Sequence, residues 1–348
     1  MRKKKRLLYA CMGMAGVSMS LLLYMQAAVP APMAAEREKS AIYPTQYSDA
    51  HITKNAVATD ERFKGLATFS KESFLAGAAG SLRKSTQEPR AERPEKGTWL
   101  WTPTLSLTPA YWDSILAGAK KNDIQAIYLS IDTYLDIYVM PDGPEKTAKK
   151  KAFGAILENF LAAARENGMV VDAEAGWRNW AEPGNEYKAS AVVDYALEFN
   201  ATHAEKFRGF QYDIEPYLLP SYAENKKEVL RNFIGLVSKT LTRLDGSDLE
   251  FSIAIPDFYD GASGETPRFF YGLSYTYTLN HLLKVLERRP GSAMLVMAYR
   301  NRSEGANGSI AISEEEIRAA NATRTRELVA QETGDASPPS GTFYNSSL

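Results

Sequence analysis

The feature that most constrains the fold is a repeated alternation, from Gly97 onward, of short apolar runs with longer amphipathic stretches. Short apolar runs are typical of buried strands, and apolar residues that recur every three to four positions are typical of helices. The predicted strands are 98–101, 124–130, 169–173, 210–214, 251–255, 294–298 and 328–331. Strand–helix units repeated in this way predict an α/β fold with a parallel sheet.

Two parallel architectures fit such a series, the (β/α)8 barrel and the doubly wound open sheet. No Gly-x-Gly-x-x-Gly follows the first predicted strand, so the best signal of a dinucleotide-binding sheet is missing. We therefore predict a TIM-like (β/α)8 barrel. An eighth strand is not evident after Glu332, where Pro338-Pro339 is followed only by a brief 342–344 segment. The expectation is a barrel that is incomplete at its C-terminal end, or a truncated one.

Three regions differ in composition. Residues 1–30 combine a basic run at 2–6 with an apolar stretch at 7–29, which predicts an export signal, either cleaved or kept as a membrane anchor. Residues 31–96 are rich in Ala, Pro, Glu and Lys and predict a linker or stalk, and residues 97–348 form the barrel domain. The single cysteine, Cys11, precedes that domain, which therefore cannot form a disulfide. We expect a secreted, cell-surface or membrane-tethered protein.

Charge and composition argue against several function classes. The 41 Lys and Arg residues nearly balance the 42 Asp and Glu residues and are mixed along the chain, so no nucleic-acid groove is predicted. There is no Gly-rich phosphate loop. Three scattered His residues and one Cys do not make a metal-binding set. We predict neither a nucleic-acid partner nor a metal or other cofactor.

Polar side chains collect just after the predicted strands. In a barrel the C-terminal strand ends converge on one mouth, where active sites lie. Asp213 and Glu215 are the most informative of these residues, because positions two apart on a strand face the same way and one carboxylate raises the pKa of the next. A Glu with a raised pKa is suited to general acid catalysis. The whole set is Asp132, Glu174, Asp213, Glu215, Asp257, Tyr299, Arg300 and Glu332.

The segment Phe207-Arg208-Gly209-Phe210-Gln211-Tyr212-Asp213-Ile214-Glu215 resembles the strand-four signature of the chitinase-type, family 18 glycoside hydrolases. Met297-Ala298-Tyr299 is similar to the Met-x-Tyr of their sixth strand. The resemblance implies a TIM barrel in which Glu215 protonates the glycosidic oxygen. It further implies that Asp213 contacts the acetamido group of the substrate and that Tyr299 donates a hydrogen bond to the intermediate.

A second resemblance assigns Glu215 a different partner. Retaining barrel glycosidases of the large Glu/Glu clan place one Glu after strand four and another after strand seven, where this chain has Glu215 and Glu332. In that mechanism Glu215 is the acid/base and Glu332 the nucleophile, with the two carboxyl groups about 5 to 5.5 Å apart. Both interpretations make Glu215 the acid.

Aromatic and basic side chains near the same strand ends are candidates for binding a glycan. Trp177 and Trp180 follow the third predicted strand in a polar loop and are expected to offer flat sugar-stacking surfaces. Tyr217, Arg300 and the remaining acidic residues complete the predicted binding set. The expected function is hydrolysis of a polysaccharide or cell-envelope glycan. Two other functions stay open, a non-catalytic carbohydrate-binding or envelope protein on a degenerate barrel and a metal-dependent hydrolase or deacetylase.

Overall fold

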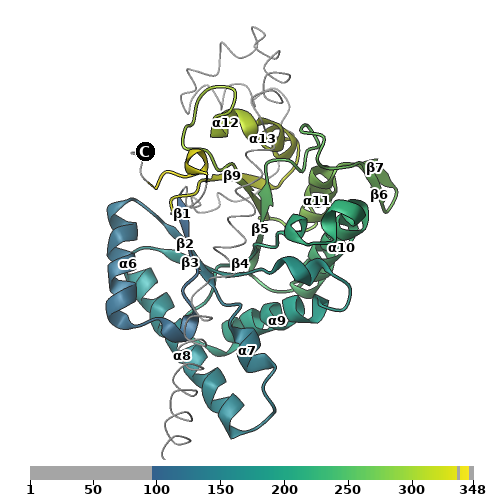
Figure 1. Cartoon of the computed structure of the whole chain (residues 1–348). Helices are drawn as coiled ribbons and strands as arrows, with labels where there is room; N and C mark the ends of the chain where they lie inside the picture. The colour runs from purple at the N-terminus through teal and green to yellow at the C-terminus, as the bar shows by residue number, and fades with distance from the viewer. Residues whose placement is uncertain (1–95, 335–337, 345–348) are drawn as a thin grey trace, which may run out of the picture.

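A computed structural model describes residues 96–334 and 338–344 and shows an α/β fold built on one curled parallel sheet (Figure 1). Its seven strands are β1 (Gly97–Leu100), β2 (Ala126–Ser130), β3 (Val170–Ala175), β4 (Gly209–Tyr212), β5 (Glu250–Pro256), β8 (Ala293–Met297) and β9 (Arg326–Ala330). They lie in the sheet in the order in which they occur in the chain. In a doubly wound sheet the order of the strands would reverse at a switch point. The predicted barrel architecture is therefore confirmed.

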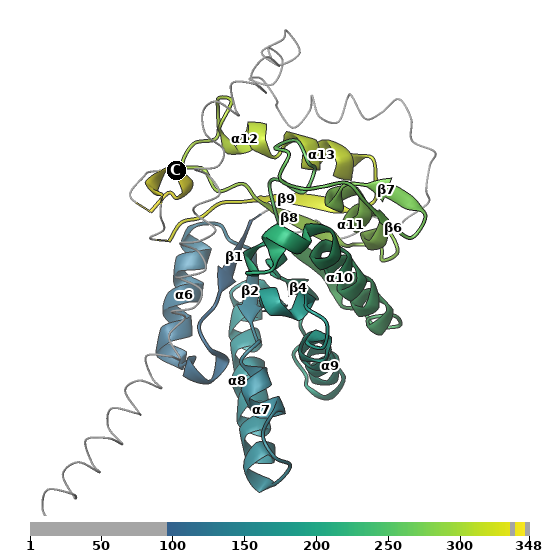
Figure 2. The same ribbon diagram turned by 45° about the vertical axis from the view of Figure 1, so that its right-hand side comes forward.

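The longer helices cover the outer face of this sheet, and the short helices pack against other helices (Figure 2). The helices are α6 (Pro109–Lys121), α7 (Tyr134–Tyr138), α8 (Pro144–Glu166), α9 (Glu186–Thr202), α10 (Tyr222–Arg243), α11 (Thr278–Leu286), α12 (Ser309–Ile312) and α13 (Glu314–Asn321). Apolar residues of the strands and helices form one buried core, which includes Ile127, Phe160, Phe210 and Leu282.

Local signals explain where individual helices begin and end. The Thr108 hydroxyl accepts a hydrogen bond from the Tyr111 N–H at the start of α6, where Pro109 occupies the first helical position. After α8, Gly168 adopts φ +77°, the left-handed conformation that ends many helices. Ser313 precedes α13 but does not cap it through its side chain, because its hydroxyl donates to the Ser309 carbonyl at 2.7 Å.

One hydrogen bond shows how strongly the sheet is curled. The indole N–H of Trp99 on β1 donates to Gln211 Oε1 on β4 at 2.5 Å. Two strands, β2 and β3, lie between them, which along a flat sheet is a separation of roughly 14 Å. The two side chains therefore meet across the concave face.

The sheet does not close within the described residues. Neither β1 nor β9 has a second strand partner there, and an isolated parallel bridge joins Glu332 to Thr342 beyond the end of β9. The 3-10 helix η8 (Pro339–Gly341) precedes that bridge. The expectation of a barrel without an eighth strand is confirmed for residues 96–334 and 338–344.

Other expectations need correction or fall outside the structure. The fourth strand was predicted to reach Ile214 but ends at Tyr212. An antiparallel hairpin of β6 (Phe269–Tyr271) and β7 (Ser274–Thr276) was not predicted. The predicted signal or anchor at 1–30 and all but the last residue of the 31–96 linker lie outside the described residues. Within the described ranges, no helix is both long enough and apolar enough to cross a bilayer.

Candidate functional site

The concave face of the sheet carries two rows of polar side chains that cross neighbouring strands. In parallel strands, residues in register point to the same face. The row nearer the C-terminal strand ends contains Ser130, Glu174, Gln211 and Ser252. The row beneath it contains Tyr128, Asp172 and Glu250, with Gly209 in register between the last two. A polar interior of this kind is suited to binding a polar ligand, because TIM-barrel interiors are otherwise packed with branched apolar residues.

Ion pairs hold the lower row. Arg208 binds Asp172 with two hydrogen bonds, one of them from Nε to Oδ1 at 2.8 Å. Burial raises the pKa of Asp172, and the guanidinium of Arg208 counteracts that rise. A Cβ at position 209 would lie 3.1 Å from Asp172 Oδ1, so Gly209 leaves room for the pair. Burial also raises the pKa of Tyr128 to about 12.

Gln211 organises the upper row. Its Oε1 accepts the Trp99 indole N–H, and its Nε2 donates to Ser252 Oγ at 3.2 Å. Trp99 stacks on Trp101 with ring centroids 5.9 Å apart and an interplanar angle of 10°. Both indoles are half-buried. The concave face therefore offers aromatic surface beside a fixed amide.

Glu215 lies just beyond the end of β4 and is held by a tyrosine. It is the residue before the 3-10 helix η7 (Pro216–Leu218), and its Oε1 accepts a hydrogen bond from the Tyr217 hydroxyl. Tyr217 is only 5% exposed, and its ring packs edge-on against Phe258 at 5.2 Å. Burial first, and then the Glu215 charge, raise the pKa of Tyr217 well above 10. Its hydroxyl thus stays protonated and orients Glu215. Tyr217 was expected to bind the substrate, but its burial suits it to positioning.

Asp213 precedes Glu215 in the same loop and is held by the neighbouring strand. Its N–H donates to the Ala175 carbonyl at 3.2 Å, which extends the β3–β4 ladder by one bond. A Cβ on Gly176 would lie 2.0 Å from the Asp213 carbonyl oxygen, so the two loops can approach this closely only because residue 176 is glycine. Both Asp213 and Glu215 are partly exposed.

Asp132 and Trp177 form a second unit at the same end of the sheet. Asp132 Oδ2 accepts the Trp177 indole N–H at 2.8 Å, and its Oδ1 accepts the Ser130 hydroxyl at 3.2 Å. Burial raises the pKa of Asp132. Glu174, which is in register with Ser130, is buried on the same face. Asp132 and Trp177 are thus in direct contact at this end of the sheet, and Glu174 lies beside Ser130 on the neighbouring strand.

Trp180, Arg300 and Asp257 lie elsewhere than expected. Trp180 is 1% exposed on the 3-10 helix η6 (Arg178–Ala181), and its ring packs edge-on against Tyr212, so it belongs to the core and offers no sugar platform. Arg300 and Asp257 form a buried ion pair at 3.3 Å, and Arg300 also donates to Asn307 at 2.9 Å. Burial raises the pKa of Asp257 to about 6. These two side chains bind each other and are not open to a glycan.

The remaining predicted residues, Tyr299 and Glu332, follow β8 and β9. Tyr299 is half-buried against the core. Glu332 Oε1 accepts two backbone N–H groups of its own turn, from Thr333 at 2.9 Å and Gly334 at 2.7 Å. In the sheet, β5 and β8 separate β4 from β9.

Sequence reasoning missed most of the polar rows. Tyr128, Ser130, Asp172 and Ser252 were not singled out, although each is a polar side chain within an otherwise apolar run. The signal was their alternation, as in Val170-Val171-Asp172-Ala173-Glu174. Polar residues at every second position indicate a strand with one polar face. Among residues 96–334 and 338–344, no group of three or more His, Cys, Asp or Glu side chains is arranged to hold a metal ion.

No family model matches this chain, and no curated protein matches it either. Solved structures similar to it include three glycoside hydrolases. An O-GlcNAc hydrolase mutant of Thermobaculum terrenum matches with a TM-score of 0.41 and 9% sequence identity, over 68% of this chain and 46% of that chain. The exo-β-1,4-mannosidase Op5Man5 of an Opitutaceae bacterium has a TM-score of 0.35 and 11% identity, over 68% of this chain and 51% of that chain. Catalytic domain 2 of the Ostrinia furnacalis group II chitinase has a TM-score of 0.40 and 13% identity, over 68% of this chain and 63% of that chain. The match covers about half to two thirds of these chains. The fold assignment rests on the strand order of the chain itself.

Proposed function

We propose that this protein is an exported glycoside hydrolase that cleaves a polysaccharide or cell-envelope glycan with Glu215 as general acid. The observation that carries the proposal is the hydrogen bond from the buried Tyr217 hydroxyl to Glu215 Oε1 at the end of β4. It holds a carboxyl group in one orientation at the mouth of a polar concave face. Catalytic groups require such positioning, because misplacement by about 1 Å can cost roughly a hundredfold in rate.

In the proposed reaction, Glu215 protonates the glycosidic oxygen as the bond from that oxygen to the anomeric carbon breaks. Oε1 accepts the Tyr217 hydroxyl, so the transferable proton resides on Oε2. Water then supplies a hydroxyl group to the anomeric carbon and returns a proton to Glu215. The group that stabilises the intermediate is either Asp213, through a substrate acetamido group, or Glu332 as nucleophile.

Substrate binding is assigned to residues around the same mouth. Trp177 is half-buried with its indole N–H held by Asp132, which leaves the ring as the binding surface for a sugar face. Trp99 and Trp101 extend that aromatic surface along the concave face. The basic and apolar segments at 1–30 support the assignment of the protein to the cell exterior, secreted or tethered to the membrane.

The test is release of reducing ends from a panel of envelope and extracellular polysaccharides by the full chain. Glu215→Gln is expected to lower the rate by roughly 10²- to 10⁴-fold, the usual contribution of a general acid. Glu224→Gln makes the same charge change on the exposed first turn of α10 and is expected to have no effect. Loss of activity in Asp213→Asn with activity retained in Glu332→Gln selects the first mechanism, and the reverse selects the second.

A binding protein on an incomplete barrel predicts a different result. The open sheet and the buried Arg300–Asp257 pair are the observations that favour it. Glycan binding without turnover, unchanged by Glu215→Gln, would remove the hydrolase proposal.

A further inference from the structure

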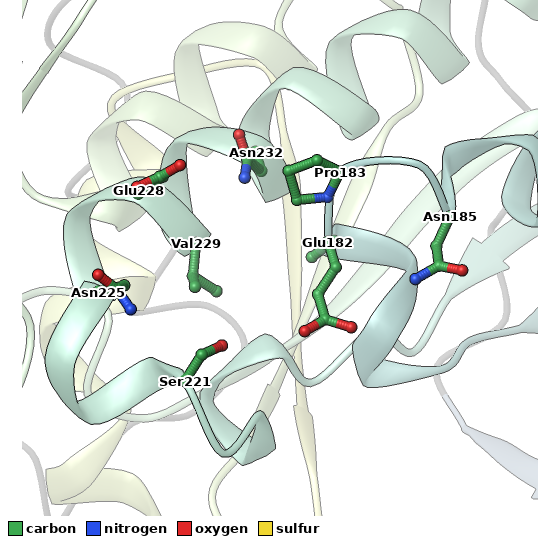
Figure 3. A pocket seen from close by; sticks show the side chains of 9 residues that line it. Glu182, Pro183, Asn185, Ser221, Asn225, Glu228, Val229 and Asn232 are labelled. Carbon is green, nitrogen blue, oxygen red and sulfur yellow. The ribbon is translucent and has the colours of Figure 1, made fainter.

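A polar cavity lies between the loop that follows η6 and the start of α10 (Figure 3). Its volume is about 430 Å³, which is within the usual range of small-molecule sites. One wall is the loop that follows η6, and the other is the first three turns of α10. The lining residues are Ala181, Glu182, Pro183, Asn185, Ser221, Asn225, Glu228, Val229 and Asn232.

A kink in α10 helps to shape this cavity. Asn225, with φ −123° and ψ 28°, departs from helical geometry inside the helix. Val229 and Ala181 are buried and form an apolar floor beneath the polar side chains. The cavity therefore combines an apolar base with a polar rim.

The polar rim consists of side chains that are not engaged by the protein. Among the described residues, the side chains of Glu182, Asn185, Ser221, Asn225, Glu228 and Asn232 make no hydrogen bond or ion pair with another residue. Lys226, the cation next to Asn225, binds Glu265 instead, with Nζ 3.1 Å from its Oε2. No Lys or Arg lines the cavity, so its two carboxylates are not balanced by a cation in the lining.

This donor and acceptor set specifies the chemistry of a ligand. Asn amides both donate and accept, as sugar hydroxyl groups do, whereas carboxylates only accept. An apolar floor matches the C–H face of a pyranose ring. Two carboxylates repel an anionic sugar and attract an ammonium group. An amino sugar with an unacetylated amine satisfies all three features.

The cavity is at the same end of the sheet as Glu215. The segment η6 follows β3, and η7 and α10 follow β4, which is the neighbour of β3 in the sheet. We propose that the cavity is an accessory subsite that binds an amino-sugar unit of the glycan. The accessory role rests on the proposed hydrolase function, whereas binding of the amino sugar does not.

Calorimetric titration of the full chain with a glucosamine tetramer tests this, with the N-acetylglucosamine tetramer of equal length as the comparison. We expect the glucosamine tetramer to bind more tightly, and its binding to weaken as salt is raised. The double variant Glu182→Gln/Glu228→Gln is expected to weaken it roughly tenfold or more, because hydrogen bonds to charged groups are the stronger kind. Glu224→Gln, the same change outside the cavity, is expected to leave it unchanged.

Equal affinity for the two tetramers, no binding of the glucosamine tetramer, or equal weakening by Glu224→Gln would each overturn the proposal. Glu228 is exposed, so the single variant Glu228→Gln is a substitute that should fold if the double variant does not. Glu215→Gln separates the two proposals. If Glu215→Gln retains tetramer binding and the unsubstituted chain shows no turnover of any glycan, the hydrolase proposal fails while the subsite stands.

Discussion

Buried carboxylates are treated in opposite ways at the centre and at the edge of the sheet. At the centre, Asp172 on β3 is bound by the guanidinium of Arg208. At the edge, Glu316 on α13 is 0% exposed, and neither of its carboxylate oxygens has a hydrogen-bond partner among the described residues. Burial raises the pKa of Glu316 to about 10 and, in the neighbouring β9, that of Glu327 to about 8.

The difference teaches that one fold can accommodate a buried carboxyl group either by pairing it with a cation or by keeping it protonated. The stability of the fold depends on pH differently in the two cases. Arginine stays charged throughout the pH range in which proteins fold, so it can hold a carboxylate partner over that whole range. A carboxyl group without a cation keeps its proton instead. The charges of Asp260 and Asp257 add to the effect of burial on Glu316. The module of α13 and β9 is therefore expected to be the pH-sensitive part of the fold.

The largest expected effect on folding stability comes from breaking the Arg208–Asp172 ion pair. Arg208→Met leaves Asp172 buried without its cation, and removal of one partner of a buried pair typically costs about 3–5 kcal/mol. Urea unfolding at pH 7 measures the loss. The double variant Asp172→Leu/Arg208→Met should recover most of the stability. A loss below about 1 kcal/mol in the single variant would show that the pair is solvated and that the contrast with the edge is false.

The next largest effect is the change of folding stability with pH that arises from Glu316. Glu316 has its pKa raised from 4.5 to about 10, so between these values the folded state binds more protons than the unfolded chain. Stability must then fall as pH rises from about 5 towards 9, by roughly 2 kcal/mol or more. Glu316→Gln, which carries no titratable proton, is expected to flatten this slope in urea unfolding measured at several pH values. An unchanged slope would assign the dependence to other groups.

The smallest effect is expected at Glu327. It is partly exposed, and solvent screening reduces the contribution of its raised pKa to well below that of Glu316. Glu327→Gln should therefore change the same pH slope by less than about 1 kcal/mol. Hydrogen-exchange protection of the β9 amides, compared with that of β3 and β4 at pH 6 and pH 9, locates the change. Equal loss of protection in all three strands would contradict an edge-specific response.

Much of the fold could be predicted because its information is local. Apolar runs and capping residues such as Thr108 mark each element within a few residues of its position. The end of β4 was missed because it depends on pairing. Asp213 makes the last ladder bond to Ala175, and Pro216, which has no N–H, begins a 3-10 helix.

The site was less predictable because its contacts join distant segments. Trp180 follows the polar residues Arg178 and Asn179, which suggested an exposed loop, but η6 turns its ring into the core against Tyr212. The polar alternation of each strand is readable in the sequence. Which polar residues meet across strands depends on register, and no single segment encodes register.

The Trp99–Gln211 hydrogen bond has a practical consequence. It joins the first strand of the sheet to the fourth, and Trp99 also stacks on Trp101. Coupled indoles give a near-ultraviolet circular dichroism band that depends on their relative orientation. Any loosening of the curl would alter that orientation. The protein thus contains an intrinsic optical probe of its own curvature, which can report on the concave face without an added label.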